Sequence, residues 1–380
     1  MHGKTMSLMK KPNKEFSDAD IYFMRLALDE AKKGLGRTAP NPCVGAVIVK
    51  GDKVISRGYH KKAGAPHAEI NALRKAGNKI KGATIYVTLE PCNHTGRTPP
   101  CSQAVAAAGI KRVVVGMTDP NPLVNGSGNT YLREHGLEVQ SGVLEKECIE
   151  INRPFIKHIS TGMPFVVMKT GMSLDGKLTY QAGEPGQMTG EKSHRQLHSL
   201  RNTVDAILVG SGTVTADNPS LTTRYGKHGR DPLRVILDSN LILSLESKIL
   251  HHNSLAPTII FCSSSSDKKK LSLLTKMKGV IVQTVSHDAK EKLDLVEILK
   301  HLGEMGICSL LVEGGAAIHS SFLKKGLVDR VMLFVAPLFA GTAGIGLLHD
   351  FPVAGRDQAL KLKDVVYKRY GDDILIQGDV

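Results

Sequence analysis

Residues 67–101 read HAEINALRKAGNKIKGATIYVTLEPCNHTGRTPPC, and this stretch decides both the fold and the chemistry of the chain. A His-x-Glu begins a predicted helix, an apolar strand follows, and a Pro-Cys pair comes directly after the strand. A second cysteine follows two further prolines. His67, Cys92 and Cys101 therefore offer one nitrogen and two thiolates, a donor set that suits tetrahedral zinc with one position left open.

An open position on zinc is where a catalytic water binds, and Glu69 lies two residues after His67. We predict that Glu69 moves a proton between that water and the leaving group. Pro66 precedes His67, and two prolines precede Cys101, so both ligands are expected at helix N-termini. The positive end of a helix dipole favours a thiolate over a thiol.

Plainer interpretations of the same residues stay open. Most cysteines in a reducing compartment are simply small buried apolar residues, and a lone His-x-Glu occurs on many surface helices. A structural zinc site is the stronger alternative, but it normally uses four protein ligands. We find no good fourth ligand within residues 67–101.

Composition places the chain among soluble globular proteins that work in a reducing compartment, and we expect a cytoplasmic location. The 380 residues suffice for two domains, and the six cysteines show no regular spacing. The uncharged stretch 331–348 is broken by Pro337 and three glycines, so we predict a buried strand and loop with no membrane span. A net charge of +14 fits nucleic acid or anionic small substrates. Only 4% of residues are aromatic, which argues against a nucleic-acid partner.

Periodicity predicts alternating strands and helices in both halves, and hence layered α/β sheets with right-handed crossovers. The first half is expected to contain helices at 18–33, 67–76, 101–109 and 128–135, and strands at 44–49, 53–59, 84–90, 112–116 and 137–140. The second half is expected to contain strands at 164–170, 204–210, 233–238, 257–261, 307–312 and 328–335, and helices at 190–201, 290–302 and 315–325. We predict one domain over 1–150, a linker over 151–163 and a second domain over 164–380.

Two glycine-containing turns in the second half indicate a nucleotide site. Residues 209–213 (VGSGT) and residues 313–315 (EGG) each follow an apolar strand and lead toward a helix. Backbone N–H groups at such turns can approach a phosphate. Each signal alone is weak, because a short glycine turn is more often only a tight turn, and no GxGxxG motif is present.

The whole chain resembles the bifunctional riboflavin-biosynthesis family, whose members are pyrimidine deaminases and reductases. In the first half the matching motifs are APNP at 39–42, VGA at 44–46, HAE at 67–69, EPCNHTGRTPPC at 90–101 and DPNP at 119–122. In the second half they are KTGMSLDGK at 169–177, Thr213, ADNP at 216–219, LTTR at 221–224 and VEGG at 312–315.

This resemblance implies a cytidine-deaminase-like three-layer domain followed by a dihydrofolate-reductase-like α/β domain. The implied reactions are zinc-dependent deamination of 2,5-diamino-6-ribosylamino-4(3H)-pyrimidinone 5′-phosphate and NADPH-dependent reduction of the ribosyl group to ribityl. NADPH contacts are implied at Gly171, Thr213, Asp217 and Gly315. Substrate contacts are expected at Arg201, Leu221, Arg224, Glu313, Lys169, Asn41 and His94. Arg201 and Arg224 also suit a sugar phosphate, because guanidinium groups bind phosphate bidentately.

One segment departs from the family pattern. Pro185 stands where a serine is common, and Gln187 stands where an aromatic residue is common. We therefore predict weaker NADPH binding, and a second domain that only binds substrate remains an alternative. More remote alternatives are an RNA-editing deaminase and a non-catalytic zinc module. The sequence leaves the oligomeric state open, a homo-oligomer included.

Overall fold

The computed structural model describes residues 16–94, 99–121, 126–184, 186–224, 229–288 and 292–380. Contacts divide the chain into two compact units, the first ending at Asn152 and the second beginning at Arg153. The short segment Leu35–Pro42 groups with the second unit. The division falls inside one helix, α5, which runs from Glu145 to Thr161.

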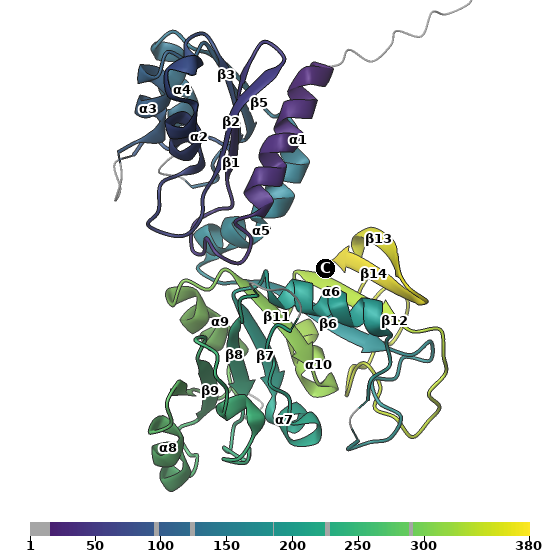
Figure 1. The fold of residues 1–380 in the computed structure, drawn as a ribbon. Coiled ribbons are helices and arrows are strands. Elements are labelled where there is room, and N and C mark those ends of the chain that lie inside the picture. Colours follow the sequence, from purple (N-terminus) through teal and green to yellow (C-terminus); the bar gives the residue numbers. More distant parts are fainter. Residues whose placement is uncertain (1–15, 95–98, 122–125, 185, 225–228, 289–291) are drawn as a thin grey trace, which may run out of the picture. The chain divides into compact units, whose positions relative to one another are not determined.

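The first unit contains a five-stranded sheet in the order β2-β1-β3-β4-β5. Strand β1 is antiparallel to both neighbours, whereas β3, β4 and β5 run parallel. Helix α1 covers one face, and α2, α3 and α4 cover the other (Figure 1). The bounds are α1 Asp18–Lys32, β1 Gly45–Lys50, β2 Lys53–Tyr59, α2 Ala68–Ala76, a 3-10 turn η1 Gly77–Ile80, β3 Thr84–Leu89, α3 Cys101–Ala107, β4 Arg112–Met117, α4 Ser127–Glu134 and β5 Glu138–Ser141.

Close helix packing in this unit depends on two glycines. A Cβ atom at Gly45 would lie 2.0 Å from the Ala27 carbonyl oxygen on α1, and one at Gly58 would lie 2.4 Å from the Ala68 carbonyl oxygen on α2. Such contacts are far inside van der Waals distance, so a side chain at either position would push the helix away. Gly58 therefore sets how closely the start of α2, which carries the His-x-Glu, lies on the sheet.

The second unit contains a nine-stranded sheet in the order β10-β9-β8-β7-β11-β6-β12-β14-β13. The first seven strands of this order are parallel, and β12, β14 and β13 pair antiparallel. The bounds are β6 Phe165–Met172, α6 Glu191–Arg201, β7 Ala206–Gly210, α7 Ser211–Asp217, β8 Leu233–Leu237, η2 Lys248–Leu250, β9 Thr258–Ser263, α8 Lys268–Thr275, β10 Val280–Val285, α9 Leu295–Glu304, β11 Ser309–Gly314, α10 Ala316–Lys324, β12 Arg330–Val335, β13 Lys363–Tyr370 and β14 Asp373–Asp379.

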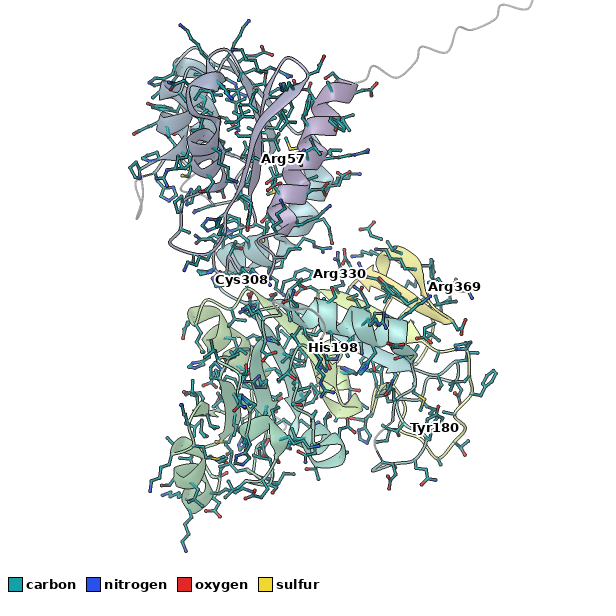
Figure 2. All side chains as sticks on the ribbon, in the orientation of Figure 1. Arg57, Tyr180, His198, Cys308, Arg330 and Arg369 are labelled. Carbon is teal, nitrogen blue, oxygen red and sulfur yellow. The ribbon has the colours of Figure 1, made fainter. Side chains whose placement is uncertain are left out.

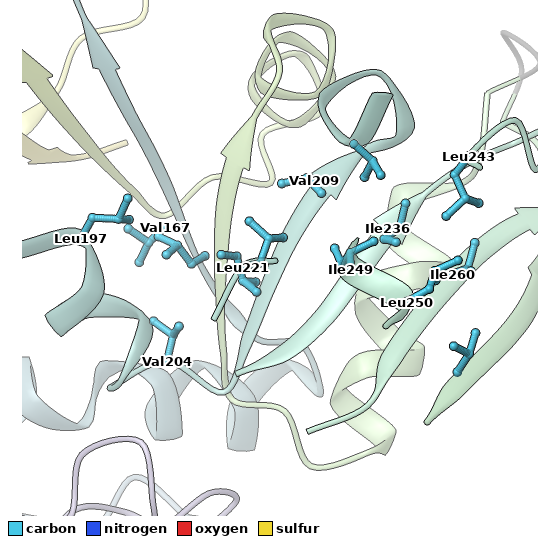
Figure 3. Packing of buried hydrophobic residues seen from close by; sticks show 14 of the residues in the cluster. Val167, Leu197, Val204, Val209, Leu221, Ile236, Leu243, Ile249, Leu250 and Ile260 are labelled. Carbon is cyan, nitrogen blue, oxygen red and sulfur yellow. The ribbon is translucent and has the colours of Figure 1, made fainter. Parts of the chain in front are cut away.

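Both faces of this sheet are buried, as expected for parallel strands covered by helices. One apolar cluster contains Val167, Val209 and Ile236 together with Leu197 of α6 (Figure 3). A second cluster on other side chains of the same strands packs against α9 and α10. Leu221 belongs to the first cluster, so the segment after α7 is anchored in the core.

The structure contains elements that the sequence analysis did not predict, among them α7, α8 and β10. The predicted linker 151–163 is largely helical, because α5 continues to Thr161 with Pro154 inside it. The sequence analysis also missed β13 and β14, since every residue of β13 except the last is exposed and the strand lacks an apolar alternation. No helix among the described residues is long and apolar enough to span a membrane.

Candidate active sites

The three predicted metal ligands of the first unit lie together. The potential ligand atoms of His67, Cys92 and Cys101 are all within 4.8 Å of one another. His67 Nδ1 lies 3.1 Å from Cys101 Sγ and 3.6 Å from Cys92 Sγ. In tetrahedral zinc with Zn–N near 2.0 Å and Zn–S near 2.3 Å, the nitrogen and a sulfur are separated by about 3.5 Å. This donor set and spacing fit zinc.

Helix N-termini position two of these ligands, as the sequence predicted. His67 is the N-cap residue of α2, and Cys101 is the first residue of α3. Cys92 follows β3, and the backbone N–H of Cys101 donates to its sulfur at 3.4 Å. A hydrogen bond from the Cys101 thiol lowers the pKa of Cys92 to about 4, and the same side-chain bond raises the pKa of Cys101. This bond favours the thiolate form of Cys92, which is the form that binds zinc.

Glu69 is buried beside this group, in the first turn of α2. Burial first, and then the negative charge at Cys92, raises the pKa of Glu69 to about 7. Its Oε2 atom has no hydrogen-bond partner among the described residues. A buried carboxyl oxygen without a partner is costly unless a ligand completes it. A carboxyl with a pKa near neutrality can both take and give a proton.

Sequence reasoning missed two residues that support the metal group. The side-chain carboxylate of Glu90, two residues before Cys92, accepts three hydrogen bonds. The donors are the backbone N–H groups of Asp119, Gly126 and Asn129, at 3.2, 2.9 and 3.0 Å. His60 is buried with its ring edge-on to the ring of His67, 5.4 Å between centroids. The signal for Glu90 was present in the sequence, because a charged residue ended an otherwise apolar strand.

The two substrate contacts predicted for the first reaction are placed less decisively. His94 is exposed and lies near Asp119. Burial raises the pKa of Asp119, and the charge of His94 acts in the opposite direction. The neighbouring residues Gly96 and Thr98 lie outside the described residues. Asn41 belongs to Leu35–Pro42, the segment that groups with the second unit, so its predicted contact stays a prediction.

A cavity of about 1080 Å³ opens at the carboxyl ends of β6, β7, β8 and β11 in the second unit. Open α/β sheets bind ligands at this edge. All nine residues predicted to contact NADPH or substrate in this unit line the cavity, namely Lys169, Gly171, Arg201, Thr213, Asp217, Leu221, Arg224, Glu313 and Gly315. The volume accommodates a dinucleotide-sized ligand rather than a single small ion.

Charged groups from two adjacent strands and one helix meet at one part of this cavity. Arg201 of α6 binds Glu313 of β11 bidentately, with Nε to Oε1 at 2.9 Å and Nη2 to Oε2 at 2.7 Å. Lys169 follows Met168 on β6, and Glu313 follows the residue paired with Met168, Val312, on β11. Burial and then Arg201 lower the pKa of Lys169, although Glu313 opposes them. An ammonium group with a lowered pKa gives up a proton more readily than an exposed lysine.

The segment Leu221–Arg224 forms another part of the wall. Leu221 has a φ of 49° and is buried, which fixes the direction in which the chain leaves the core. The Arg201 Nη1 group donates to the Thr222 carbonyl at 3.2 Å. Arg224 is exposed, and its Nη2 donates to Ser220 Oγ at 3.2 Å. Its guanidinium is thus available at the rim, whereas that of Arg201 is occupied by Glu313.

The predicted NADPH contacts lie along the glycine turns. Gly210 ends β7, and Thr213 and Asp217 lie on α7, which follows directly. Gly315 caps α10, and a Cβ there would lie 3.4 Å from Thr213 Oγ1, so the two turns touch. A Cβ at Gly171 would lie 3.1 Å from the Thr189 side chain. Gln187 also lines the cavity, whereas Pro185 lies outside the described residues.

Comparisons with known proteins match both units of the chain. Residues 17–117 match the cytidine and deoxycytidylate deaminase zinc-binding region, and residues 164–376 match the RibD C-terminal domain. The chain is similar to riboflavin biosynthesis protein RibD of Aquifex aeolicus, at 44% identity over 94% of this chain and 98% of that protein. The Escherichia coli RibD protein is 38% identical over 86% and 90% of the two chains.

Two solved structures share the fold over 95% of this chain, each at 37% sequence identity. Acinetobacter baumannii RibD, of which 99% is covered, has a TM-score of 0.84. The Thermotoga maritima diaminohydroxyphosphoribosylaminopyrimidine deaminase/5-amino-6-(5-phosphoribosylamino)uracil reductase, of which 98% is covered, has a TM-score of 0.83.

Proposed function

Because this chain belongs to the RibD family of bifunctional riboflavin-biosynthesis enzymes, we propose that each of its two units catalyses one of two successive reactions, with the residues described above. The protein is a zinc-dependent pyrimidine deaminase and an NADPH-dependent reductase. Its substrates are small phosphorylated pyrimidines. What we propose beyond this is the assignment of each residue.

In the first unit, His67, Cys92 and Cys101 would hold the zinc. When bound, zinc supplies a Lewis acid that makes water acidic near neutral pH. Glu69 receives the proton from that water and passes one to the departing ammonia, since its pKa is raised to about 7. Glu90 and His60 keep the ligands in place through the backbone and ring contacts described above.

In the second unit, the cavity at the strand ends would hold NADPH and the deaminated pyrimidine together. NADPH supplies a hydride when bound. The turns at Gly210–Thr213 and Gly315 approach the cofactor, and Asp217 contacts it. Lys169 and Glu313 face the ribosyl group, where a buried ammonium and a carboxylate can move a proton as the sugar ring opens. Arg224 binds the 5′-phosphate, because its guanidinium is exposed at the rim.

The observation that supports this assignment best is the separation of the two donor sets. A proton-moving carboxyl and a His/Cys/Cys group lie within one unit. The cationic cavity and the glycine turns lie wholly within the other. A test follows from the order of the reactions: the aminopyrimidine substrate is incubated with zinc-loaded protein, with and without NADPH, and ammonia and NADPH are measured separately. We expect ammonia in both samples. Ammonia release that requires NADPH would contradict the assignment.

One observation keeps a second candidate function in view, a second unit that binds substrate but reduces it poorly. Gln187 lines the cavity where relatives commonly place an aromatic side chain, and an amide offers less apolar surface to a cofactor ring. We expect the Gln187→Trp variant to bind NADPH more tightly than the wild type in a fluorescence titration. Unchanged or weaker binding would mean that this position does not contact the cofactor.

We also propose that the protein works in the cytoplasm. No disulfide joins any of the six cysteines, two of which are assigned to zinc. Cysteines without disulfides and a thiolate metal site are typical of a reducing compartment.

A further inference from the structure

His198 is a buried residue of the second unit to which the reaction above gives no role. It lies on α6 (Figure 2), between His194 and Arg201. All three residues line the cavity. The spacing of four and three residues places them on one face of the helix. Only about 1% of His198 is exposed.

The ring of His198 accepts a hydrogen bond from the main chain of a cavity segment. The backbone N–H of Arg224 donates to His198 Nδ1 at 3.1 Å. Because an N–H can only donate, Nδ1 must carry its lone pair, and a neutral ring then bears its proton on Nε2. Burial first, and then the charges of Arg201, His194 and Arg224, lower the pKa of His198 to about 4. The charges that face the ring are therefore cationic groups that keep it neutral, with Glu313 opposing them.

Two side chains of α6 hold the same short segment. Arg201 donates to the Thr222 carbonyl, and His198 accepts from Arg224 two residues later. On its other side the segment is held at Thr223, whose N–H donates to Asp231 Oδ1 at 2.7 Å and whose hydroxyl donates to the Arg230 carbonyl at 2.9 Å. His198 therefore fixes the main chain directly at the residue that bears the guanidinium.

We propose that His198 is a positioning residue of the reductase site. His198 fixes the Arg224 main chain, and the Arg224 guanidinium then meets the substrate phosphate at a set place relative to the Arg201–Glu313 pair. The inference rests on the proposed function, since it needs Arg224 to bind that phosphate. It assigns His198 a geometric role through its acceptor atom and no proton transfer.

Two amide variants distinguish the loss of the Nδ1 hydrogen-bond acceptor from the loss of the rest of the His198 ring. In His198→Asn the amide oxygen is attached to Cγ, as Nδ1 is, so the Arg224 N–H keeps its acceptor. In His198→Gln the oxygen lies one bond further from the helix and cannot occupy that place. His198→Leu removes the acceptor altogether. One lost hydrogen bond of about 0.5–1.5 kcal/mol corresponds to an affinity about 2–10-fold weaker.

The experiment measures binding of ribose 5-phosphate to the full-length, zinc-loaded chain by calorimetry, and KM and kcat for reduction. We expect His198→Gln and His198→Leu to weaken binding and raise KM about 2–10-fold with kcat nearly unchanged, and His198→Asn to match the wild type. Because the ring is neutral, the effect should be equal at pH 6.5 and pH 8. Ammonia release and NADPH affinity should not change in any of the three.

Equal impairment of the Asn and Gln variants would overturn the inference, as would wild-type binding by the Gln variant. If His198→Leu fails to fold, the Asn and Gln pair alone decides. An Arg224→Ala variant separates phosphate binding by Arg224 from the positioning role of His198. Wild-type affinity for ribose 5-phosphate in Arg224→Ala would refute the phosphate site itself. Weakened binding in Arg224→Ala together with wild-type binding in His198→Gln would refute only the role of His198.

Discussion

Arg201 and Glu313 form a bidentate ion pair in which both side chains are about one-tenth exposed. Removing one partner of such a pair leaves a buried charge uncompensated, at a cost of about 3–5 kcal/mol, whereas replacing both with apolar residues is often neutral. We therefore expect Glu313→Leu to lower the free energy of unfolding of the second unit markedly. The double variant Arg201→Met, Glu313→Leu should recover most of that loss but remain inactive as a reductase. Urea unfolding compares the two, and equal destabilisation would show that the pair is not energetically coupled.

The metal group gives a second prediction. Cys92→Ala should lose zinc and ammonia release together, because two protein ligands hold zinc poorly. Metal analysis of the dialysed protein measures the loss directly. Cys148→Ala is a suitable control, since that thiol is buried away from the three ligands within the same unit. A folded Cys92→Ala, Cys101→Ala double variant with about one zinc per chain would disprove the ligand assignment.

Glu69 separates proton transfer from metal binding. Glu69→Gln keeps the shape of the side chain but cannot exchange a proton, so we expect zinc retention and ammonia release reduced by about 10²-fold or more. Zinc content and the initial rate of ammonia release are measured on the same preparation. Loss of the metal in this variant would mean that Glu69 is itself a ligand.

A pH dependence follows from His319 of α10, which is fully buried in the second unit. Burial first, and then the charge of Lys169, lower its pKa from 6.5 to about 4. Between pH 6.5 and pH 4 the unfolded chain therefore binds a proton at His319, whereas the folded chain does not. The contribution of neutral His319 to the free energy of unfolding is complete above pH 6.5 and is lost as the pH falls. At pH 4.5 the loss is about 2–3 kcal/mol. His319→Leu should show a smaller fall in unfolding free energy between pH 7.5 and 4.5 than the wild type. An equal fall in both would show that His319 is already charged in the folded protein.

The sequence alone was sufficient to predict those residues of each site that lie at the ends of predicted helices and strands. The zinc ligands could be predicted because His67 and Cys101 begin helices and Cys92 follows a strand, so spacing alone brings them near one another. The glycine turns after β7 and β11 were predicted for the same reason.

Contacts that join distant segments could not be predicted in this way. The bidentate Arg201–Glu313 pair and the hydrogen bond from Arg224 to His198 depend on the order of strands in the sheet, which periodicity does not give. The helix α5 was missed because residues 151–163 were interpreted as a linker, whereas one helix contributes its first turns to the first unit and its last turns to the second. Strand β13 was missed because it is exposed and carries no alternating pattern.

The most direct test of the central claim uses two variants, each altered in one unit. Glu69→Gln is supplied with the deaminated pyrimidine and NADPH, and Asp217→Ala is supplied with the original aminopyrimidine. Because the two sites share no residue and each lies within its own unit, Glu69→Gln should oxidise NADPH at the wild-type rate and Asp217→Ala should release ammonia at the wild-type rate. Each should fail at the other reaction. Loss of both activities in either folded variant would contradict a division of the two reactions between the two units.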